Sequence, residues 1–212
     1  MTELEQLQRQ TQHIYETNAN EFDQQRNKSL FEKQWLDKFI SFIPRGGSIL
    51  DLGCGSGEPV SSYLVNQGYS ITGIDFATNM LSLARKRLPE QRWVLQDMRH
   101  LQLERRFHGI LSWNGFFHLN QDEQVGVLEK CSQYLHASGA LLLTVGPDKG
   151  ETCGQVNGHE VYHASLSPQA YKKTMEKYHL QLIDFVPNDS TCQDHSVLLA
   201  QKNNSASNPN LY

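Results

Sequence analysis

Three glycines spaced two residues apart constrain this chain more than any other feature. Residues 49–52 (Ile-Leu-Asp-Leu) are a short, mostly apolar run, and Gly53, Gly55 and Gly57 follow it at once. An amphipathic segment begins directly after them, so the stretch predicts a buried strand, a tight loop and a helix with Pro59 in its first turn. Glycines let the backbone turn sharply and let a ligand come close. The pattern therefore favours a ligand-binding loop over a plain turn.

The spacing of the glycines also limits the kind of ligand. A dinucleotide-binding loop, Gly-x-Gly-x-x-Gly, would have its third glycine at position 58, where this chain has Glu58. A carboxylate in the place of a pyrophosphate argues against NAD and FAD. No Gly-Lys-Ser or Gly-Lys-Thr follows the glycines, so the phosphate loop of nucleoside triphosphatases is absent as well. We therefore expect a nucleoside ligand that carries no phosphate.

The stretch resembles motif I of the class I S-adenosylmethionine-dependent methyltransferases. Two acids support the resemblance, because Asp75 ends the next predicted strand and Asp97 follows the one after it. Ligands of open α/β sheets bind at the carboxyl ends of the strands. The resemblance implies that Asp75 holds the ribose hydroxyls, whereas Asp97 takes the exocyclic amine of adenine and Met98 packs on the ring. The competing interpretation of Asp75 is an N-cap of the following helix.

The resemblance implies S-adenosylmethionine as the cofactor and S-adenosylhomocysteine as the product. The strand at residues 107–114 corresponds to motif IV, beside the transferable methyl group, and His118 shortly after it is the candidate catalytic base. A structural histidine bonded to backbone explains His118 equally well. The residues expected to bind the cofactor are Asp51, Gly53, Gly55, Gly57, Asp75, Phe76, Met80, Asp97, Met98 and Trp113, and Asn114 is expected to contact the substrate.

The order of elements predicts an α/β fold with a Rossmann-like, seven-stranded, mostly parallel sheet. The last two strands, at residues 180–186 and 196–200, are joined by a polar loop too short for a crossover helix, so they are expected to be antiparallel. One reversed strand is unlike a dehydrogenase and matches the methyltransferase sheet. The resemblance covers residues 49–200.

Two further segments are expected near the ligand. Residues 1–45 contain two amphipathic stripes and predict a helical cap, in which Tyr15 and Arg26 are candidate substrate contacts. Asn157-Gly158 predicts a β-hairpin within residues 146–166, a candidate lid with Tyr162 and His163 as contacts. Core packing and a simple connecting ribbon are the competing explanations. We expect residues 1–202 to form one domain and residues 203–212 to be a disordered tail.

Composition limits the partners. With 212 residues, a net charge of -4 and a pI near 6.1, the chain has room for one substantial core and lacks the basic balance of nucleic-acid-binding proteins. The four cysteines show no metal-ligand spacing, so no metal site is expected. No signal peptide or membrane-spanning run is evident. We expect a cytoplasmic monomer or homodimer with no membrane partner.

These observations together predict a methyltransferase that acts on a small-molecule acceptor by in-line displacement. A sulfonium makes its methyl group electrophilic, and orientation alone supplies about 7–11 kcal/mol in favourable cases, so no catalytic dyad is needed. One alternative is a non-catalytic module that binds S-adenosylmethionine or S-adenosylhomocysteine as a sensor or scaffold. Another is a nicotinamide oxidoreductase, which Glu58 and the reversed terminal strand disfavour.

Overall fold

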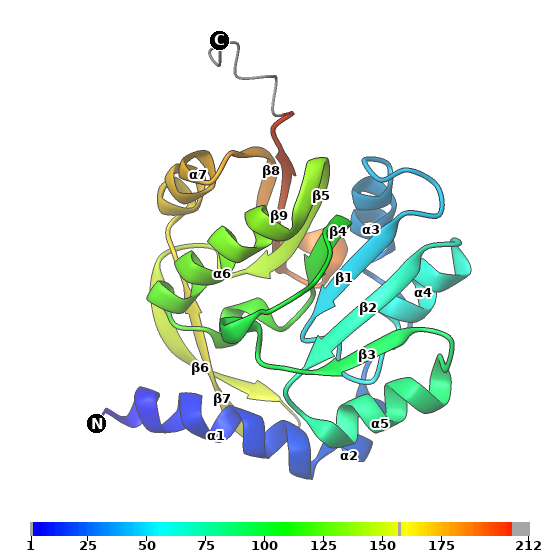
Figure 1. Ribbon diagram of the computed structural model, residues 1–212. Helices are drawn as coiled ribbons and strands as arrows, with labels where there is room; N and C mark the ends of the chain where they lie inside the picture. Colours follow the sequence, from blue (N-terminus) through cyan, green and yellow to red (C-terminus); the bar gives the residue numbers. More distant parts are fainter. Residues whose placement is uncertain (1, 157, 205–212) are drawn as a thin grey trace.

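A seven-stranded sheet forms the centre of the protein, as the computed structural model shows for residues 2–156 and 158–204 (Figure 1). The strands lie in the order β3-β2-β1-β4-β5-β9-β8, and β9 is antiparallel to both of its neighbours while the other six strands run parallel. The predicted sheet with one reversed strand is therefore confirmed. The strands are β1 (Ser48–Leu52), β2 (Ser70–Asp75), β3 (Arg92–Leu95), β4 (Phe107–Ser112), β5 (Leu135–Val145), β8 (Leu180–Asp189) and β9 (His195–Lys202).

Helices cover both faces of the sheet. Successive side chains of a strand point to opposite faces, so Ile49 packs in one apolar core and Leu50 in the other. Both faces of the central strands are therefore buried, which is why these strands are largely apolar. The helices on the Ile49 face are α3 (Lys33–Ile40), α4 (Val60–Asn66) and α5 (Thr78–Arg87), and those on the Leu50 face are α6 (Gln121–Tyr134) and α7 (Pro168–Lys177).

Of these five helices, α6 and α7 are preceded by a residue whose side chain caps the first turn. Ser167 is the N-cap of α7, and its hydroxyl accepts a hydrogen bond from the backbone N–H of Ala170. Pro59 was expected inside the first turn of α4, but the helix begins at Val60 and Pro59 is its N-cap. Among the described residues, no helix has the length and apolarity that crossing a membrane requires.

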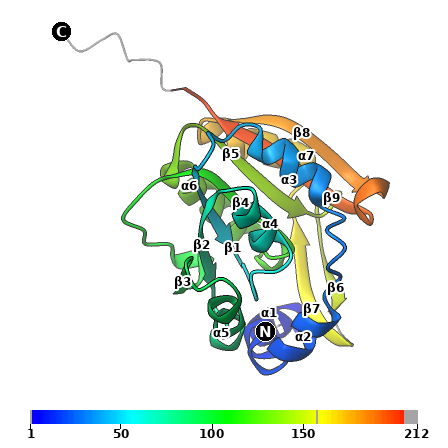
Figure 2. The same ribbon diagram turned by 90° about the vertical axis from the view of Figure 1, so that its right-hand side faces the viewer.

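Two segments lie across the edge to which the parallel strands point (Figures 1 and 2). One comprises the helices α1 (Glu3–Thr17) and α2 (Ala19–Gln25), and the other is the antiparallel hairpin of β6 (Gly150–Val156) and β7 (His159–Ser165). The predicted hairpin is thus present, although Asn157 of its expected turn lies outside the described residues. The sequence predicted two helices before β1, and α2 is a third, formed because Ala19 and Phe22 share a buried side.

Candidate active site

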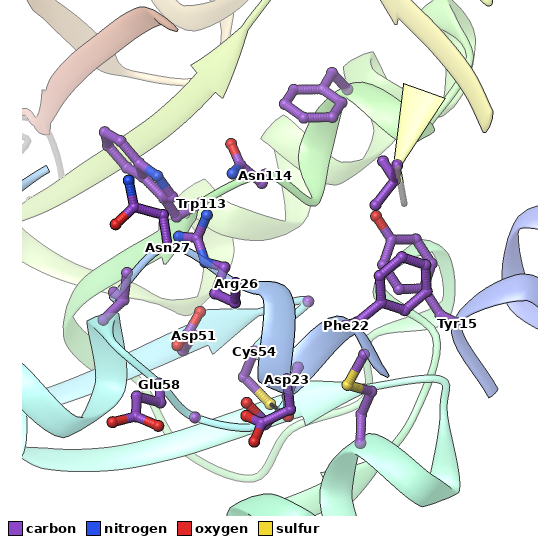
Figure 3. A pocket seen from close by; sticks show the side chains of 18 of the residues that line it. Tyr15, Phe22, Asp23, Arg26, Asn27, Asp51, Cys54, Glu58, Trp113 and Asn114 are labelled. Atoms are coloured by element: carbon purple, nitrogen blue, oxygen red, sulfur yellow. Dashed lines mark hydrogen bonds between the residues drawn. The ribbon is translucent and has the colours of Figure 1, made fainter. Parts of the chain in front are cut away.

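A cavity of about 450 Å³ lies beside the loop that follows β1, and we call it the glycine-loop cavity (Figure 3). Gly53, Gly55 and Gly57 line it with left-handed φ angles of +71°, +53° and +77°. Any other L-residue would pay roughly 1–2 kcal/mol for such a conformation, so the loop shape requires glycine. The predicted binding residues that line this cavity are Tyr15, Arg26, Asp51, Gly53, Gly55, Gly57, Met80, Trp113, Asn114 and His163.

Two buried carboxyl groups stand at the ends of β1 and β2. The Asp51 carboxylate accepts a hydrogen bond from the Ser61 hydroxyl at 2.6 Å. Burial raises the pKa of Asp51 to about 7. The hydrogen bond from Ser61 opposes this rise, and the nearby Asp75 carboxylate adds to it. Burial likewise raises the pKa of Asp75 to about 6, although backbone hydrogen bonds oppose the rise. The edge beside the glycine loop is therefore acidic and poorly solvated, an environment that favours a cationic ligand group.

Asp75 lies next to the cavity but does not line it. Its carboxylate accepts hydrogen bonds from the backbone N–H groups of Gly55 at 2.9 Å and Ala77 at 2.8 Å. The bond to Ala77 fits the competing interpretation, in which Asp75 caps the start of α5. The bond to Gly55 fixes the glycine loop, a role that the sequence did not reveal. Its contact with a ribose stays a prediction.

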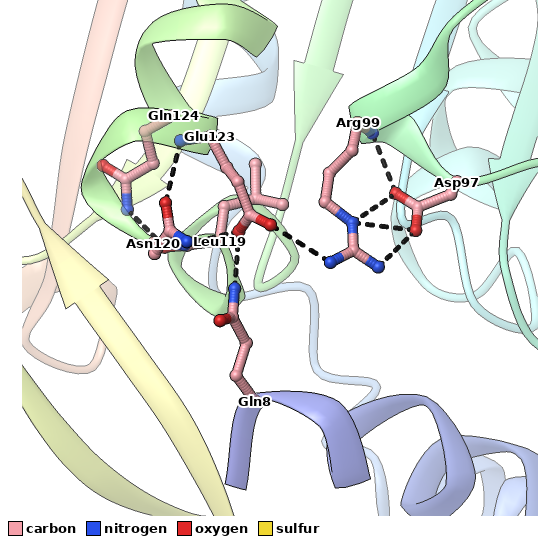
Figure 4. Close-up of polar contacts among 7 residues, drawn as sticks. All are labelled: Gln8, Asp97, Arg99, Leu119, Asn120, Glu123 and Gln124. Carbon is pink, nitrogen blue, oxygen red and sulfur yellow. Dashed lines mark hydrogen bonds and ion pairs between the residues drawn. The ribbon is translucent and has the colours of Figure 1, made fainter. Parts of the chain in front are cut away.

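A second group of predicted residues lines a separate cavity of about 410 Å³. We call it the adenine-end cavity because the sequence predicts an adenine contact at Asp97, one of its lining residues. Asp97 there is paired with Arg99, whose Nε lies 3.0 Å and 2.9 Å from the two carboxylate oxygens and whose Nη2 lies 2.5 Å from Oδ2 (Figure 4). Although burial opposes ionisation, hydrogen bonds from Arg99 hold the pKa of Asp97 below its usual value. The predicted residues that line this cavity are Phe76, Asp97, Met98 and His118.

Contacts with α1 cover the adenine-end cavity. Arg99 also donates to Glu123 at 3.1 Å, and the amide of Gln8 donates to the other carboxylate oxygen of Glu123 at 2.5 Å (Figure 4). Gln8 belongs to α1 and Glu123 to the first turn of α6. The Asp97 carboxylate is therefore held in a chain of polar contacts that ends on the N-terminal helix.

Tyr15 and His118 stand between the two cavities. The Tyr15 hydroxyl lies 3.0 Å from Nε2 of His118, and Nδ1 of His118 lies 2.9 Å from the carbonyl oxygen of Tyr162. A carbonyl only accepts, so Nδ1 carries the proton and Nε2 accepts from Tyr15. Burial lowers the pKa of His118 to about 4, although the bond to the Tyr162 carbonyl opposes this shift. His118 is neutral with both ring nitrogens engaged, which favours the structural explanation; its catalytic role stays a prediction.

The ion pairs around the glycine-loop cavity leave its acids partly neutralised. Arg26 lines the cavity and donates to the fully buried Glu32 at 2.9 Å. Glu58, the acid that argued against a pyrophosphate, lies 2.9 Å from Lys28 and 3.1 Å from Arg87. The pair with Lys28 connects the loop to the segment after α2, and the pair with Arg87 connects it to α5. The predicted contact Tyr162 is buried and lines neither the glycine-loop cavity nor the adenine-end cavity.

The end of β4 brings together residues that the sequence did and did not reveal. Asn114 has a φ of +60° and its backbone N–H donates to the Thr144 hydroxyl at 2.8 Å. The Asn114 Oδ1 lies 2.9 Å from Nε2 of His195, whose ring stacks on Trp113 at 5.8 Å. His195 was not predicted as a site residue. It is the first residue of β9, and because β9 is reversed, this residue lies at the edge where the parallel strands end. Phe117 also lines this part of the cavity.

Comparisons with known proteins agree with this arrangement. Residues 49–139, which run from β1 into β5, match a family model described as a methyltransferase domain. This match, together with relatives that are themselves named as methyltransferases, supports the predicted class I S-adenosylmethionine-dependent methyltransferase. The predictions of family and fold are both confirmed. The matched segment contains the glycine loop, Asp75, Asp97 and the end of β4.

Individual relatives match different parts of this chain. YqeM of Bacillus subtilis (strain 168), a protein named only as a methyltransferase, is 35% identical over 91 residues, which are 42% of this chain and 36% of that protein. The dTDP-3-amino-3,4,6-trideoxy-alpha-D-glucopyranose N,N-dimethyltransferase of Streptomyces venezuelae is 28% identical over 109 residues, 50% of this chain and 46% of that one. The chain thus matches less than half the length of these two curated relatives.

A solved structure extends the likeness to nearly the whole fold. The Burkholderia thailandensis 1,6-didemethyltoxoflavin-N1-methyltransferase, crystallised with 1,6-didemethyltoxoflavin and S-adenosylhomocysteine, aligns with a TM-score of 0.73 and 17% identity. The alignment covers 96% of this chain and 92% of that one. At this identity the likeness concerns the fold, and the fold includes the sheet edge at which both described cavities open.

Proposed function

We propose that the protein binds S-adenosylmethionine across the ends of β1, β2 and β3 and transfers its methyl group to a small-molecule acceptor. The observation that carries the proposal is the glycine-loop cavity, because three left-handed glycines and a buried acid line it inside the matched methyltransferase domain. A sulfonium supplies an electrophilic methyl group when bound. The protein then has to orient the acceptor and exclude water.

The donors in the glycine-loop cavity fit the methionine portion of the cofactor. The indole Nε1 of Trp113 is buried and has no hydrogen-bond partner among the described residues. Arg26 lines the same cavity and keeps donors beyond the one bonded to Glu32. These two side chains would receive a carboxylate, whereas the acid Asp51 suits the amino group and the sulfonium. An unpaired buried donor is costly, so its presence supports a ligand at this place.

The other half of the site is proposed to hold the adenosine portion. Asp75 and Asp97 stand at the ends of β2 and β3, the places where a ribose and an adenine would follow the glycine loop. Each carboxylate already has protein donors, but an ionised carboxylate has about four acceptor positions and can accept further bonds. The Tyr15 ring lies between the two cavities, so we expect α1 to shift when adenosine binds.

A small acceptor is supported by the size of the site and by the relatives. The glycine-loop cavity holds about 450 Å³, the scale of small-molecule sites. The Streptomyces relative is named for an amino sugar nucleotide, and the Burkholderia structure contains a small heterocycle. These names describe those proteins, and they favour an acceptor of similar scale here.

The test is methyl transfer from S-adenosylmethionine with a labelled methyl group to a panel of small metabolites, monitored by the release of S-adenosylhomocysteine. We expect turnover with a subset of the panel. Binding of S-adenosylhomocysteine with no turnover of any acceptor would instead select a sensor or scaffold. Tight NADH binding without S-adenosylhomocysteine binding would select an oxidoreductase.

A further inference from the structure

A cavity of about 400 Å³ adjoins the glycine-loop cavity on the side of the β6–β7 hairpin, and we call it the hairpin cavity. Its lining comes from the segment after β5, from both hairpin strands and from the turn before β9. Phe117, His163 and His195 line both cavities. These three side chains are therefore the boundary between the proposed cofactor and a molecule in the hairpin cavity.

His163 in this boundary has a nitrogen without a partner. Its Nε2 is buried and has no hydrogen-bond partner among the described residues. The ring lies 4.5 Å from the Phe117 ring and 5.1 Å from the His118 ring, measured between centroids. Burial lowers the pKa of His163, so the ring is neutral near pH 7. Since buried polar atoms are nearly always paired, this nitrogen indicates a missing ligand group.

A glycine on the neighbouring strand gives His163 its place. A Cβ added at Gly154 would lie 2.2 Å from Cε1, 2.5 Å from Nδ1 and 2.8 Å from Nε2 of His163. The imidazole therefore packs directly on the backbone of β6, and any side chain at position 154 would push it away. This contrasts with Gly126 in α6, where an added Cβ meets nothing within 4 Å.

The charge of the hairpin cavity is one-sided. Asp148, Glu151 and Asp194 are the charged residues that line it, and neither lysine nor arginine is among the described lining residues. A carboxylate or phosphate in this cavity would meet only like charge. An amine, which is cationic in water, would be attracted.

We propose that the methyl acceptor occupies the hairpin cavity, presents an amine to the glycine-loop cavity, and is bound at its attacking nitrogen by Nε2 of His163. The proposal rests on the proposed function. The bound ammonium group first gives one proton to Nε2 of His163, which frees the lone pair of the attacking nitrogen. That lone pair forms the new N–C bond as the C–S bond breaks and its electron pair goes to sulfur. The methylated nitrogen leaves as an ammonium ion, and His163 releases its proton to water.

The role of His163 is tested by His163→Gln, with His159→Gln on the same strand as the matched control. We expect kcat to fall on the order of 100-fold in His163→Gln, with the KM for S-adenosylmethionine and the S-adenosylhomocysteine affinity unchanged. Gly154→Ala should reproduce this effect by displacing the ring, whereas Gly126→Ala should not. Normal kcat in both His163→Gln and Gly154→Ala would overturn the role.

The acceptor class is tested with matched pools of small primary and secondary amines, alcohols and carboxylic acids. Each pool is incubated with the full-length protein and labelled S-adenosylmethionine, after S-adenosylhomocysteine binding has been measured. We expect methylation in the amine pool alone. Methylation confined to acids or alcohols, or no methylation in any pool, would overturn the amine proposal. If the full-length protein does not bind S-adenosylhomocysteine, the proposed function itself is contradicted.

Discussion

The glycine-loop cavity and the adenine-end cavity are built in different ways. The first is made by backbone, since three left-handed glycines follow β1 and a single carboxylate, Asp75, holds the loop through Gly55. The second is made by side chains, because Arg99 covers the Asp97 carboxylate. One end is preformed, whereas the other has to rearrange around its ligand. Ligand binding should therefore depend strongly on the loop and weakly on the side chains of the adenine end.

The largest effect is expected at Asp75, which holds the glycine loop through Gly55 and is proposed to bind the ribose. Asp75→Ala removes the proposed ribose contacts and the hydrogen bond to Gly55, and each bond to a charged group contributes about 1.5–3 kcal/mol. We expect S-adenosylhomocysteine to bind about 100-fold more weakly by calorimetry. Asp122→Ala, at an exposed acid of α6, is the control. Unchanged affinity in Asp75→Ala would remove this residue from the site.

A change confined to the loop should have the next largest effect. Gly53→Ala forces a left-handed φ on an alanine and brings its Cβ to 3.3 Å from Cε of Met98 and 3.4 Å from Cα of Gly115. The strain of roughly 1–2 kcal/mol should weaken S-adenosylhomocysteine binding about tenfold. Gly126→Ala should bind normally. Equal affinities in the two variants would mean that the loop is not preformed.

Substitutions at the adenine end should change the affinity for S-adenosylhomocysteine by a few-fold only, and in opposite directions at two neighbouring residues. Asp97→Ala removes the proposed contact with the exocyclic amine, so S-adenosylhomocysteine should bind more weakly. Arg99→Met keeps the apolar stem but frees the Asp97 carboxylate, so binding should become tighter. Calorimetry on the two variants measures both signs. A change in the same direction would show that Arg99 does not compete with the adenine.

The smallest effect is a pH dependence at the loop end. Burial raises the pKa of Asp51 to about 7, so this carboxyl group is a weaker acid in the folded protein than in the unfolded protein. The unfolded protein therefore loses this proton first, and the free energy of unfolding falls as the pH rises from about 4 to 7, which is the cost of an ionised Asp51. A cationic sulfonium relieves that cost. The affinity for S-adenosylmethionine relative to S-adenosylhomocysteine should therefore rise about threefold between pH 6 and pH 8. The ratio should be flat in Asp51→Asn, and a flat ratio in the wild type would contradict this account.

The same contrast explains which features the sequence revealed. The glycine loop, Asp75 and the hairpin could be predicted because each depends on local backbone preferences or on the place where a parallel strand ends. The pairing of Tyr15 with His118 could not, since 103 residues separate them and the contact depends on how α1 packs. His195 occupied a position that strand direction could have indicated, because a reversed strand starts at the ligand edge.

The central claim is that an adenosyl group without phosphate lies across the ends of β1, β2 and β3. Calorimetric titration of the purified protein with S-adenosylhomocysteine, beside a titration with NADH, tests it most directly. We predict saturable binding of one S-adenosylhomocysteine per chain and no heat from NADH. Heat from NADH alone, or from neither compound, would contradict the account.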